Sequence, residues 1–99
     1  MATHARRRLI LIWTESFART ARKFLRRHPD MEGIFEDIVR QLETDPRAPR
    51  LRLHSLHGTH RGKHAVSLTY EYRIVLILGI TGGEIVLLDI GSHDEVHRG

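Results

Sequence analysis

Apolar residues in the first half of the chain recur with a helical period. A helix is predicted to start after Thr14 or Ser16, either of which can cap it, and to end at His28-Pro29. Its apolar face holds Phe17, Ala21, Phe24 and Leu25. A second helix is predicted from Asp30, as its N-cap, to Asp45-Pro46, because the apolar residues again fall at steps of three and four: Met31, Ile34, Phe35, Ile38 and Leu42.

The remaining apolar segments favour strands. Residues 9–13 form a short run that predicts a buried strand before the helices. Residues 64–69 alternate weakly, and residues 72–78 are apolar on both faces, as in a central strand. Thr81-Gly82-Gly83-Glu84 predicts a hairpin that leads into a returning strand over residues 85–90.

These elements predict an α+β fold in a single domain spanning residues 1–99. A two-helix hairpin packs on one face of an antiparallel sheet, in the order strand, helix, helix, then three strands in a meander. The other face of the sheet, with its end loops, is left for a functional site.

Composition narrows the cellular setting. The chain of 99 residues has no cysteine, which excludes a disulfide framework and thiolate chemistry and fits a reducing cytoplasm. The apolar run at residues 9–13 is shorter than the core of a secretory leader, and the run at residues 74–80 is too short to span a bilayer. We therefore expect a cytoplasmic protein without a membrane segment.

Positive charge is concentrated near the N-terminus. Residues 1–27 contain seven arginines and one lysine against a single acid, Glu15. On the first predicted helix, one face carries Arg19, Arg22, Lys23 and Arg26. Such a face suits an acidic protein partner or ribosomal RNA, and the alternative is a plain solvated helix surface.

Histidine is the most frequent candidate for acid–base chemistry. Six of the eight histidines lie in residues 54–97. Imidazole exchanges protons near neutral pH, so two histidine-rich loops could supply an acid and a base. The spacings His57-x2-His60-x3-His64 and His93-x3-His97 could instead bind a metal, but they match no strict ligand motif, and we expect neither a metal nor another cofactor.

Arg73 stands out because it opens an apolar strand, where an unpaired guanidinium is costly to bury. It could pair with an acid such as Asp89 or Glu71. Alternatively, it could face the open side of the sheet and bind an anion, for which the planar guanidinium suits a phosphate.

Three segments together resemble the RelE/ParE superfamily of bacterial toxins, closest to the RelE and YafQ-type branch. They are His54-Ser55-Leu56-His57-Gly58, Tyr72-Arg73-Ile74-Val75 and Ile90-Gly91-Ser92-His93-Asp94-Glu95-Val96-His97. The resemblance covers residues 9–98. It implies a ribosome-dependent, metal-independent endoribonuclease that cleaves mRNA by attack of the 2′-hydroxyl on the adjacent phosphate, and that a cognate antitoxin holds inactive.

The resemblance also implies residue roles. Arg73 would stabilise the phosphate, and His93 and His54 would act as acid or base. His97 stands where the family usually has tyrosine or phenylalanine and could stack on a base or share a proton. The neighbouring candidates for RNA binding are Arg61, Lys63, His64 and Tyr72, of which Tyr72 could stack on a base or belong to the core instead.

The chain departs from the family pattern at several of these positions. Ser67 falls where the YafQ-type branch has a second histidine, Glu71 replaces an aspartate, and Asp89 stands where an arginine is expected. Two alternatives therefore stay open. One is a ParE-like toxin that inhibits a topoisomerase and cleaves nothing, although such chains generally lack this histidine set. The other is a degenerate relative that only binds an antitoxin, which Asp89 and His97 favour.

Overall fold

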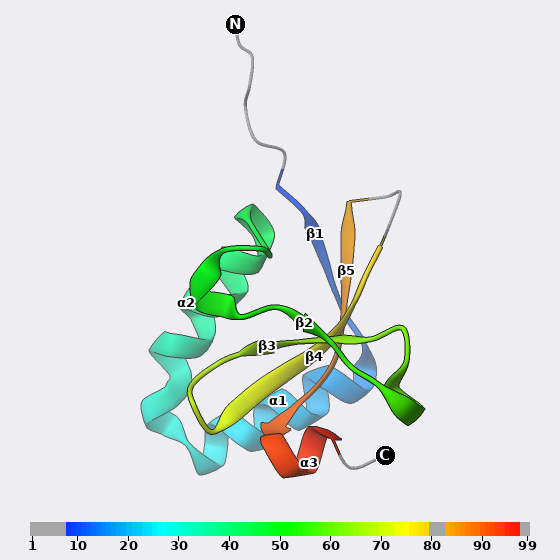
Figure 1. Cartoon of the computed structure of the whole chain (residues 1–99). Coiled ribbons are helices and arrows are strands. Elements are labelled where there is room, and N and C mark those ends of the chain that lie inside the picture. The colour runs from blue at the N-terminus through cyan, green and yellow to red at the C-terminus, as the bar shows by residue number, and fades with distance from the viewer. Residues whose placement is uncertain (1–7, 80–82, 98–99) are drawn as a thin grey trace, which may run out of the picture.

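The chain begins with one strand, continues with two long helices, and ends with four strands and a short helix. The computed structural model describes residues 8–79 and 83–97, and the predicted turn at residues 81–82 lies outside these ranges. The elements follow in the order β1 (Ile10–Trp13), α1 (Glu15–Arg27), α2 (Glu32–Thr44), β2 (His54–Ser55), β3 (His64–Ser67), β4 (Tyr72–Leu78), β5 (Glu84–Ser92) and α3 (His93–His97) (Figure 1). Short 3₁₀ turns precede α2, β2 and β3: η1 (Pro29–Met31), η2 (Pro49–Leu51) and η3 (Gly58–His60).

The five strands form one sheet in the order β1-β5-β4-β3-β2. Strands β2 to β5 pair antiparallel, which confirms the predicted meander, whereas β1 pairs parallel to β5. The α+β class is therefore confirmed, but the sheet is mixed rather than antiparallel throughout. A parallel pair needs a long crossover connection, and α1 and α2 lie within that connection.

Thr14 ties the start of α1 to the sheet. Its Oγ1 accepts a hydrogen bond from the Phe17 N–H at 3.0 Å and donates one to the Leu87 carbonyl at 2.8 Å. The predicted cap is thus confirmed as Thr14. Asp30, however, does not cap α2: it lies inside η1, which Pro29 opens, and the residue that precedes α2 is Met31, without a side-chain cap.

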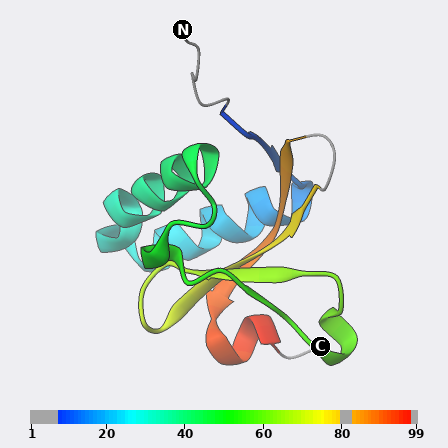
Figure 2. The ribbon, with the colours of Figure 1, turned by 45° about the horizontal axis from the view of Figure 1, so that its top comes forward.

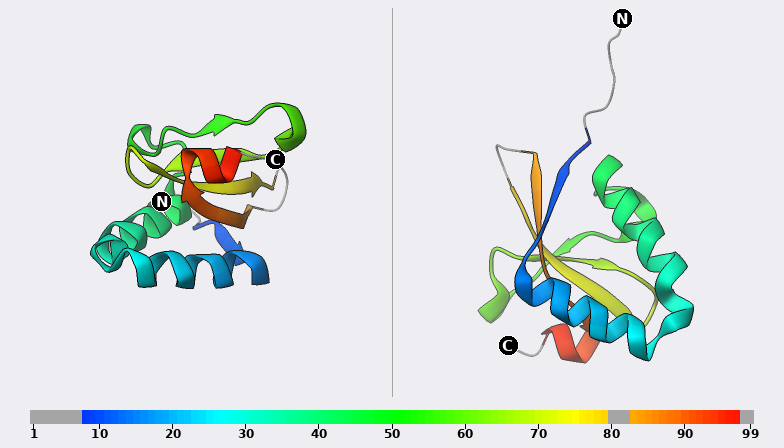
Figure 3. Two further views of the ribbon diagram at one scale, coloured as in Figure 1. Left: turned by 90° about the horizontal axis from the view of Figure 1, so that it is seen from below. Right: turned by 180° about the vertical axis from the view of Figure 1, so that it is seen from behind.

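The main core lies between the helix pair and one face of the sheet (Figures 2 and 3). The helices contribute most of the predicted apolar positions, of which Phe17 and Leu42 are fully buried, whereas the prediction is wrong for Ile34, which is 40 % exposed. The sheet side of this core is formed by Val66, Leu68, Ile74, Leu76, Ile85, Leu87 and Ile90.

A β-bulge in the central strand pair allows this core to form. Val75 pairs with Asp89, but the next residue, Leu76, pairs with Leu87, so Leu88 is an extra residue in β5. Side chains alternate along a strand, and the extra residue reverses which positions face the helices. Ile85, Leu87 and Ile90 therefore all reach the main core.

The strand β1 is more exposed than predicted. Ile10 is 59 % exposed and Trp13 44 %, so the prediction of a buried strand is wrong. β1 is an edge strand with a neighbour on one side only. Ile10 and Ile12 alternate with Leu11, which packs on the main core, and so they point to the opposite face.

A small second cluster occupies the other face of the sheet. Leu56, Ala65, Val75 and Val96 are buried together there, and Val96 comes from α3. Figure 3 (left) shows the sheet between α1 on one side and α3 on the other. The sequence predicted that this second face is free, but in the structure α3 covers part of it. Within the described ranges, no helix has the length and apolar character needed to cross a bilayer.

Two isoleucine-to-alanine substitutions test this assignment of core and edge. Ile74→Ala should lower the free energy of unfolding by about 2–5 kcal/mol, because Ile74 is fully buried and a cavity would remain. Ile10→Ala removes the same atoms from an exposed position and should cost less than about 1 kcal/mol. Urea unfolding of both variants measures the difference, and equal losses would contradict this placement of β1.

Candidate active site

The sheet register places two of the predicted site residues, Arg73 and His54, on the face that carries α3. Arg73 pairs with Ser67 of β3 and with Gly91 of β5, so these three residues form one row across the sheet. In the next row, His54 pairs with Ala65, which pairs with Val75. Val75 belongs to the cluster beneath α3, and Arg73, two residues before it in β4, lies on the same face because side chains alternate along a strand.

Arg73 is half-buried and is held by the turn between β3 and β4. Its guanidinium donates to the backbone carbonyls of Thr69 at 3.3 Å and Tyr70 at 3.2 Å. It forms no ion pair with any carboxylate of residues 8–79 and 83–97, Glu71 and Asp89 included. The neighbours in its row are small, because Ser67 has a short side chain and Gly91 has none. Of the two alternatives for Arg73, the structure favours the one in which its charge stays available to an anion.

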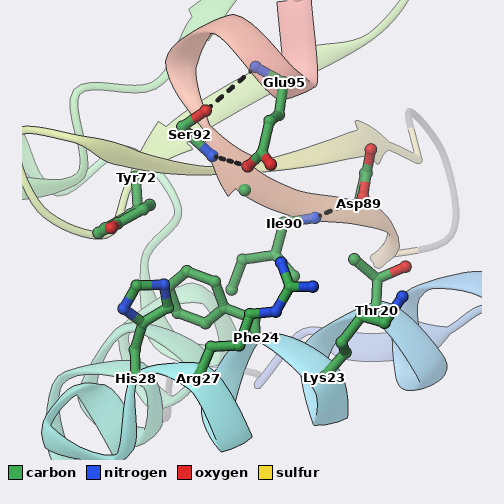
Figure 4. A pocket seen from close by; sticks show the side chains of 11 residues that line it. Thr20, Lys23, Phe24, Arg27, His28, Tyr72, Asp89, Ile90, Ser92 and Glu95 are labelled. Carbon is green, nitrogen blue, oxygen red and sulfur yellow. Dashed lines mark hydrogen bonds between the residues drawn. The ribbon is translucent and has the colours of Figure 1, made fainter.

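His93 is positioned by the start of α3. Its backbone N–H donates to the Glu71 carbonyl at 3.1 Å, which places it beside the first residues of β4. A capping box begins the helix: the Ser92 N–H donates to Glu95 Oε1 at 2.8 Å, and the Glu95 N–H donates to Ser92 Oγ at 3.2 Å (Figure 4). The spacing Ser-x-x-Glu at residues 92–95 is the sequence signal for this box. Sequence reasoning considered only the histidines of this segment and missed it.

His54 is exposed, and its ring is oriented by the backbone. Nδ1 lies 2.9 Å from the Arg52 carbonyl oxygen. A carbonyl can only accept, so in this contact Nδ1 carries the proton. In the neutral ring the basic lone pair is then on Nε2.

Two predicted RNA-binding residues lie on the opposite, helix-covered face. Tyr72 packs against Phe24 and His28, with ring centroids 5.0 and 4.9 Å away (Figure 4). His64 pairs with Leu76 of the main core, and its Nε2 lies 3.3 Å from Ser55 Oγ. The structure therefore does not bring Tyr72 or His64 together with Arg73, because each is an odd number of positions along its strand from the residues of the α3 face.

The other predicted residues are more distant from Arg73. Arg61 is exposed and Lys63 half-buried in the turn before β3, and Lys63 lines a cavity with His60 and Asp89. Strand geometry separates the Cα atoms of Lys63 and Arg73 by roughly 14 Å. The side chain of His97 lies outside the described part of the structure.

The four basic residues of α1, namely Arg19, Arg22, Lys23 and Arg26, are all exposed, as predicted. They belong to α1, which lies on the other side of the sheet from α3 (Figure 3). Lys23 and Arg27 also line a cavity of about 490 Å³ between α1 and β5, with Tyr72 and Asp89 on its sheet side (Figure 4).

Sequence reasoning missed three residues next to Arg73. Arg50, Arg52 and Tyr70 line a cavity of about 270 Å³ together with Arg73, Ser67, Leu68 and Thr69. The available signal was the dense basic run at residues 47–52, in which three of six residues are arginine. Among residues 8–79 and 83–97, no three histidine or acidic side chains are grouped so that they could hold a metal ion.

Comparison with solved structures finds this fold in bacterial toxins. YafQ from E. coli superimposes with a TM-score of 0.74 over 90% of this chain and 97% of YafQ at 15% identity, and YafQ is also solved in a toxin–antitoxin complex with DinJ. A copper-bound mutant toxin from Helicobacter pylori has a TM-score of 0.72 at 24% identity, covering 89% and 98% of the two chains. A YoeB/ParE toxin from Agrobacterium tumefaciens has a TM-score of 0.71 at 22% identity, covering 86% and 99%.

No protein-family model matches the chain, and no curated protein matches it significantly. At these identities the likeness establishes the fold. The chain has the fold of the RelE/ParE/YafQ toxins, which confirms the resemblance recognised in its sequence.

The ring orientation of His54 can be measured directly. Nitrogen-15 NMR of the histidine rings above neutral pH should show the His54 proton on Nδ1, because the Arg52 carbonyl accepts it. The exposed His57 of the same loop serves as the internal reference. A proton on Nε2 of His54 would contradict the contact.

Proposed function

We propose that this chain is the toxin of a type II toxin–antitoxin system and that it cleaves mRNA on the ribosome. The starting point is the fold, which it has in common with YafQ and the YoeB/ParE toxin. The observation that carries the proposal is the placement of Arg73, whose charge no described carboxylate neutralises, on the same sheet face as His54 and beside the start of α3, where His93 lies.

The chemistry needs a base, an acid and a positive charge. The RNA 2′-hydroxyl loses its proton to the base, and its oxygen attacks the adjacent phosphorus. The bond from phosphorus to the 5′-oxygen breaks, and the acid donates a proton to that oxygen. The products are a 2′,3′-cyclic phosphate and a 5′-hydroxyl, and no metal is required.

His54 is suited to the role of base, because its Nδ1 proton is directed to the Arg52 carbonyl and Nε2 carries the lone pair. His93, in its protonated form, is then assigned the role of acid. Arg73 stabilises the extra negative charge that develops on the phosphate oxygens. From the sheet register, the Cα atoms of His54 and Arg73 are roughly 12 Å apart, a span that their side chains and one nucleotide can fill.

Asp89, which stands where the family pattern has an arginine, is compatible with this chemistry. Asp89 pairs with Val75, one row from Arg73, and its Oδ1 accepts the Ile90 N–H at 2.9 Å. It therefore does not neutralise Arg73. Catalysis without the arginine expected at this position depends more heavily on Arg73 and on the basic residues around it.

The implied partner is a cognate antitoxin, as DinJ is for YafQ. The exposed basic face of α1 suits an acidic antitoxin segment or ribosomal RNA. We expect this chain to meet both partners in the cytoplasm.

Co-expression tests the basic face of α1 as the antitoxin site. An antitoxin should restore growth to cells that express the wild-type chain, and it should fail to do so when the chain carries Arg22→Glu and Arg26→Glu.

Expression in bacteria tests the proposal. The wild-type chain should arrest growth, and mapping of RNA ends should show cuts within translated mRNA. Arg73→Gln and His93→Gln should each relieve the arrest and reduce cutting by at least about 100-fold, the usual scale for loss of an acid, a base or a stabilising donor. Arg40→Gln, at an exposed position of α2 outside both the α1 basic face and the candidate site, is the matched control and should still cut.

Other outcomes point to the alternatives. Growth arrest with intact mRNA and inhibited topoisomerase would assign the ParE-like activity. Normal growth with tight antitoxin binding would assign a relative without catalysis. Full toxicity and cutting by Arg73→Gln would contradict the nuclease mechanism.

A further inference from the structure

The cavity beside Arg73 is lined by three arginines and no acid. Arg50 and Arg52 join Arg73 there, with Ser67, Leu68, Thr69 and Tyr70 completing the lining. Three guanidinium groups around one small hollow repel one another unless an anion separates them. The composition of the lining therefore points to an anionic ligand.

Arg52 is placed by an unusual backbone conformation. It has a φ of 51°, the only positive φ of a non-glycine residue in the described part of the chain. This left-handed conformation is unfavourable for residues with a side chain, and it follows the turn η2, which the fully buried Leu51 anchors. The Arg52 carbonyl is also the group that holds the His54 ring. One strained residue thus connects the cavity to the candidate base.

Arg50 is hydrogen-bonded to a backbone carbonyl and not to a carboxylate. Its guanidinium donates to the backbone carbonyl of Asp37 at 3.4 Å, whereas the Asp37 carboxylate pairs with Arg40 at 3.7 Å. No described carboxylate forms an ion pair with Arg50 or Arg52. All three arginines of the cavity therefore contribute positive charge.

Tyr70 presents an aromatic ring to solvent at the edge of this cavity. It is 90 % exposed at the turn between β3 and β4, and its carbonyl accepts the hydrogen bond from Arg73. Exposed aromatic rings next to arginines are the usual platform for unpaired nucleic-acid bases, because every base can stack on such a ring. This feature favours single-stranded RNA over an acidic peptide.

We infer that the cavity is a second nucleotide subsite. The RNA strand whose scissile phosphate lies at Arg73 continues over Arg52 and Arg50, which bind a neighbouring phosphate, while a base of that strand stacks on Tyr70. The inference rests on the proposed function, since it extends the same RNA path. It assigns substrate binding to residues 50, 52 and 70, which lie outside the predicted site.

Fluorescence anisotropy with a labelled nine-nucleotide 2′-O-methyl-uridine RNA tests the subsite, because this probe lacks the attacking hydroxyl and stays intact. In Arg50→Gln/Arg52→Gln, binding should weaken, and the slope of log K against log salt should become shallower by about 0.7, as expected when one phosphate of a single strand is no longer neutralised. Arg47→Gln is the matched control, from the same basic run but outside the cavity lining. It should change the slope little.

Tyr70→Ala should weaken binding about five-fold or more, whereas Tyr70→Phe should bind as the wild type does, because stacking needs only the ring. An abasic probe of the same length should bind wild type and Tyr70→Ala equally. Thermal unfolding midpoints of all variants should match the wild type, since the three residues lie outside the main core.

Several outcomes would overturn the inference. One is an unchanged salt slope in the double arginine variant; another is an equal effect of Arg47→Gln. A third is an oligoglutamate peptide that binds more tightly than the RNA probe and loses this affinity in the double variant, which would make the cavity a protein-docking site. If only the subsite inference is wrong, Arg73→Gln still reduces mRNA cutting. If the proposed function is wrong, the RNA probe still binds at the cavity but the chain cuts no mRNA.

Discussion

The pairing of β4 with β5 is the constraint on which the rest of this structure depends. These central strands are buried by the main core on one side and by the α3 cluster on the other. Their register sets Arg73 opposite Gly91 and ends β5 so that His93 bonds to Glu71. The bulge at Leu88 keeps apolar residues on the helix side on both sides of the irregularity. A shift of one residue would exchange the two faces and move Arg73 into the main core.

The two faces of the sheet differ in how much apolar surface covers them. The helix-covered face supplies most of the buried apolar surface, and Tyr72 belongs to it through its contacts with Phe24 and His28. The α3 face is only partly covered, so polar groups can reach solvent there without losing a large hydrophobic area. The basic helix α1 lies on the other side of the sheet from α3 (Figure 3).

The positive charges of Arg73 and Arg50 are retained because of the kind of hydrogen bond that each guanidinium makes. The guanidinium groups of Arg73 and Arg50 donate to backbone carbonyls, which are neutral. Such bonds fix the direction of the side chain but do not cancel its charge, as a carboxylate would. A rigid cation directed by neutral partners is suited to bind phosphate, since little reorganisation is needed when the anion arrives.

Sequence alone determined the elements whose signal is local. The helical period of Phe17, Ala21 and Phe24, the presence of a cap at Thr14 or Ser16, the proline ends and the apolar run of β4 each depend on neighbours within a few residues. They gave the α+β class and, with three short segments, the toxin fold. Tertiary structure alone decided the features that depend on pairing between distant strands: the parallel edge strand β1, the bulge at Leu88, and the face on which each polar residue lies. Arg50, Arg52 and Tyr70 join Arg73 only because η2 and the β3–β4 turn meet at the same end of the sheet, and no local pattern encodes that meeting.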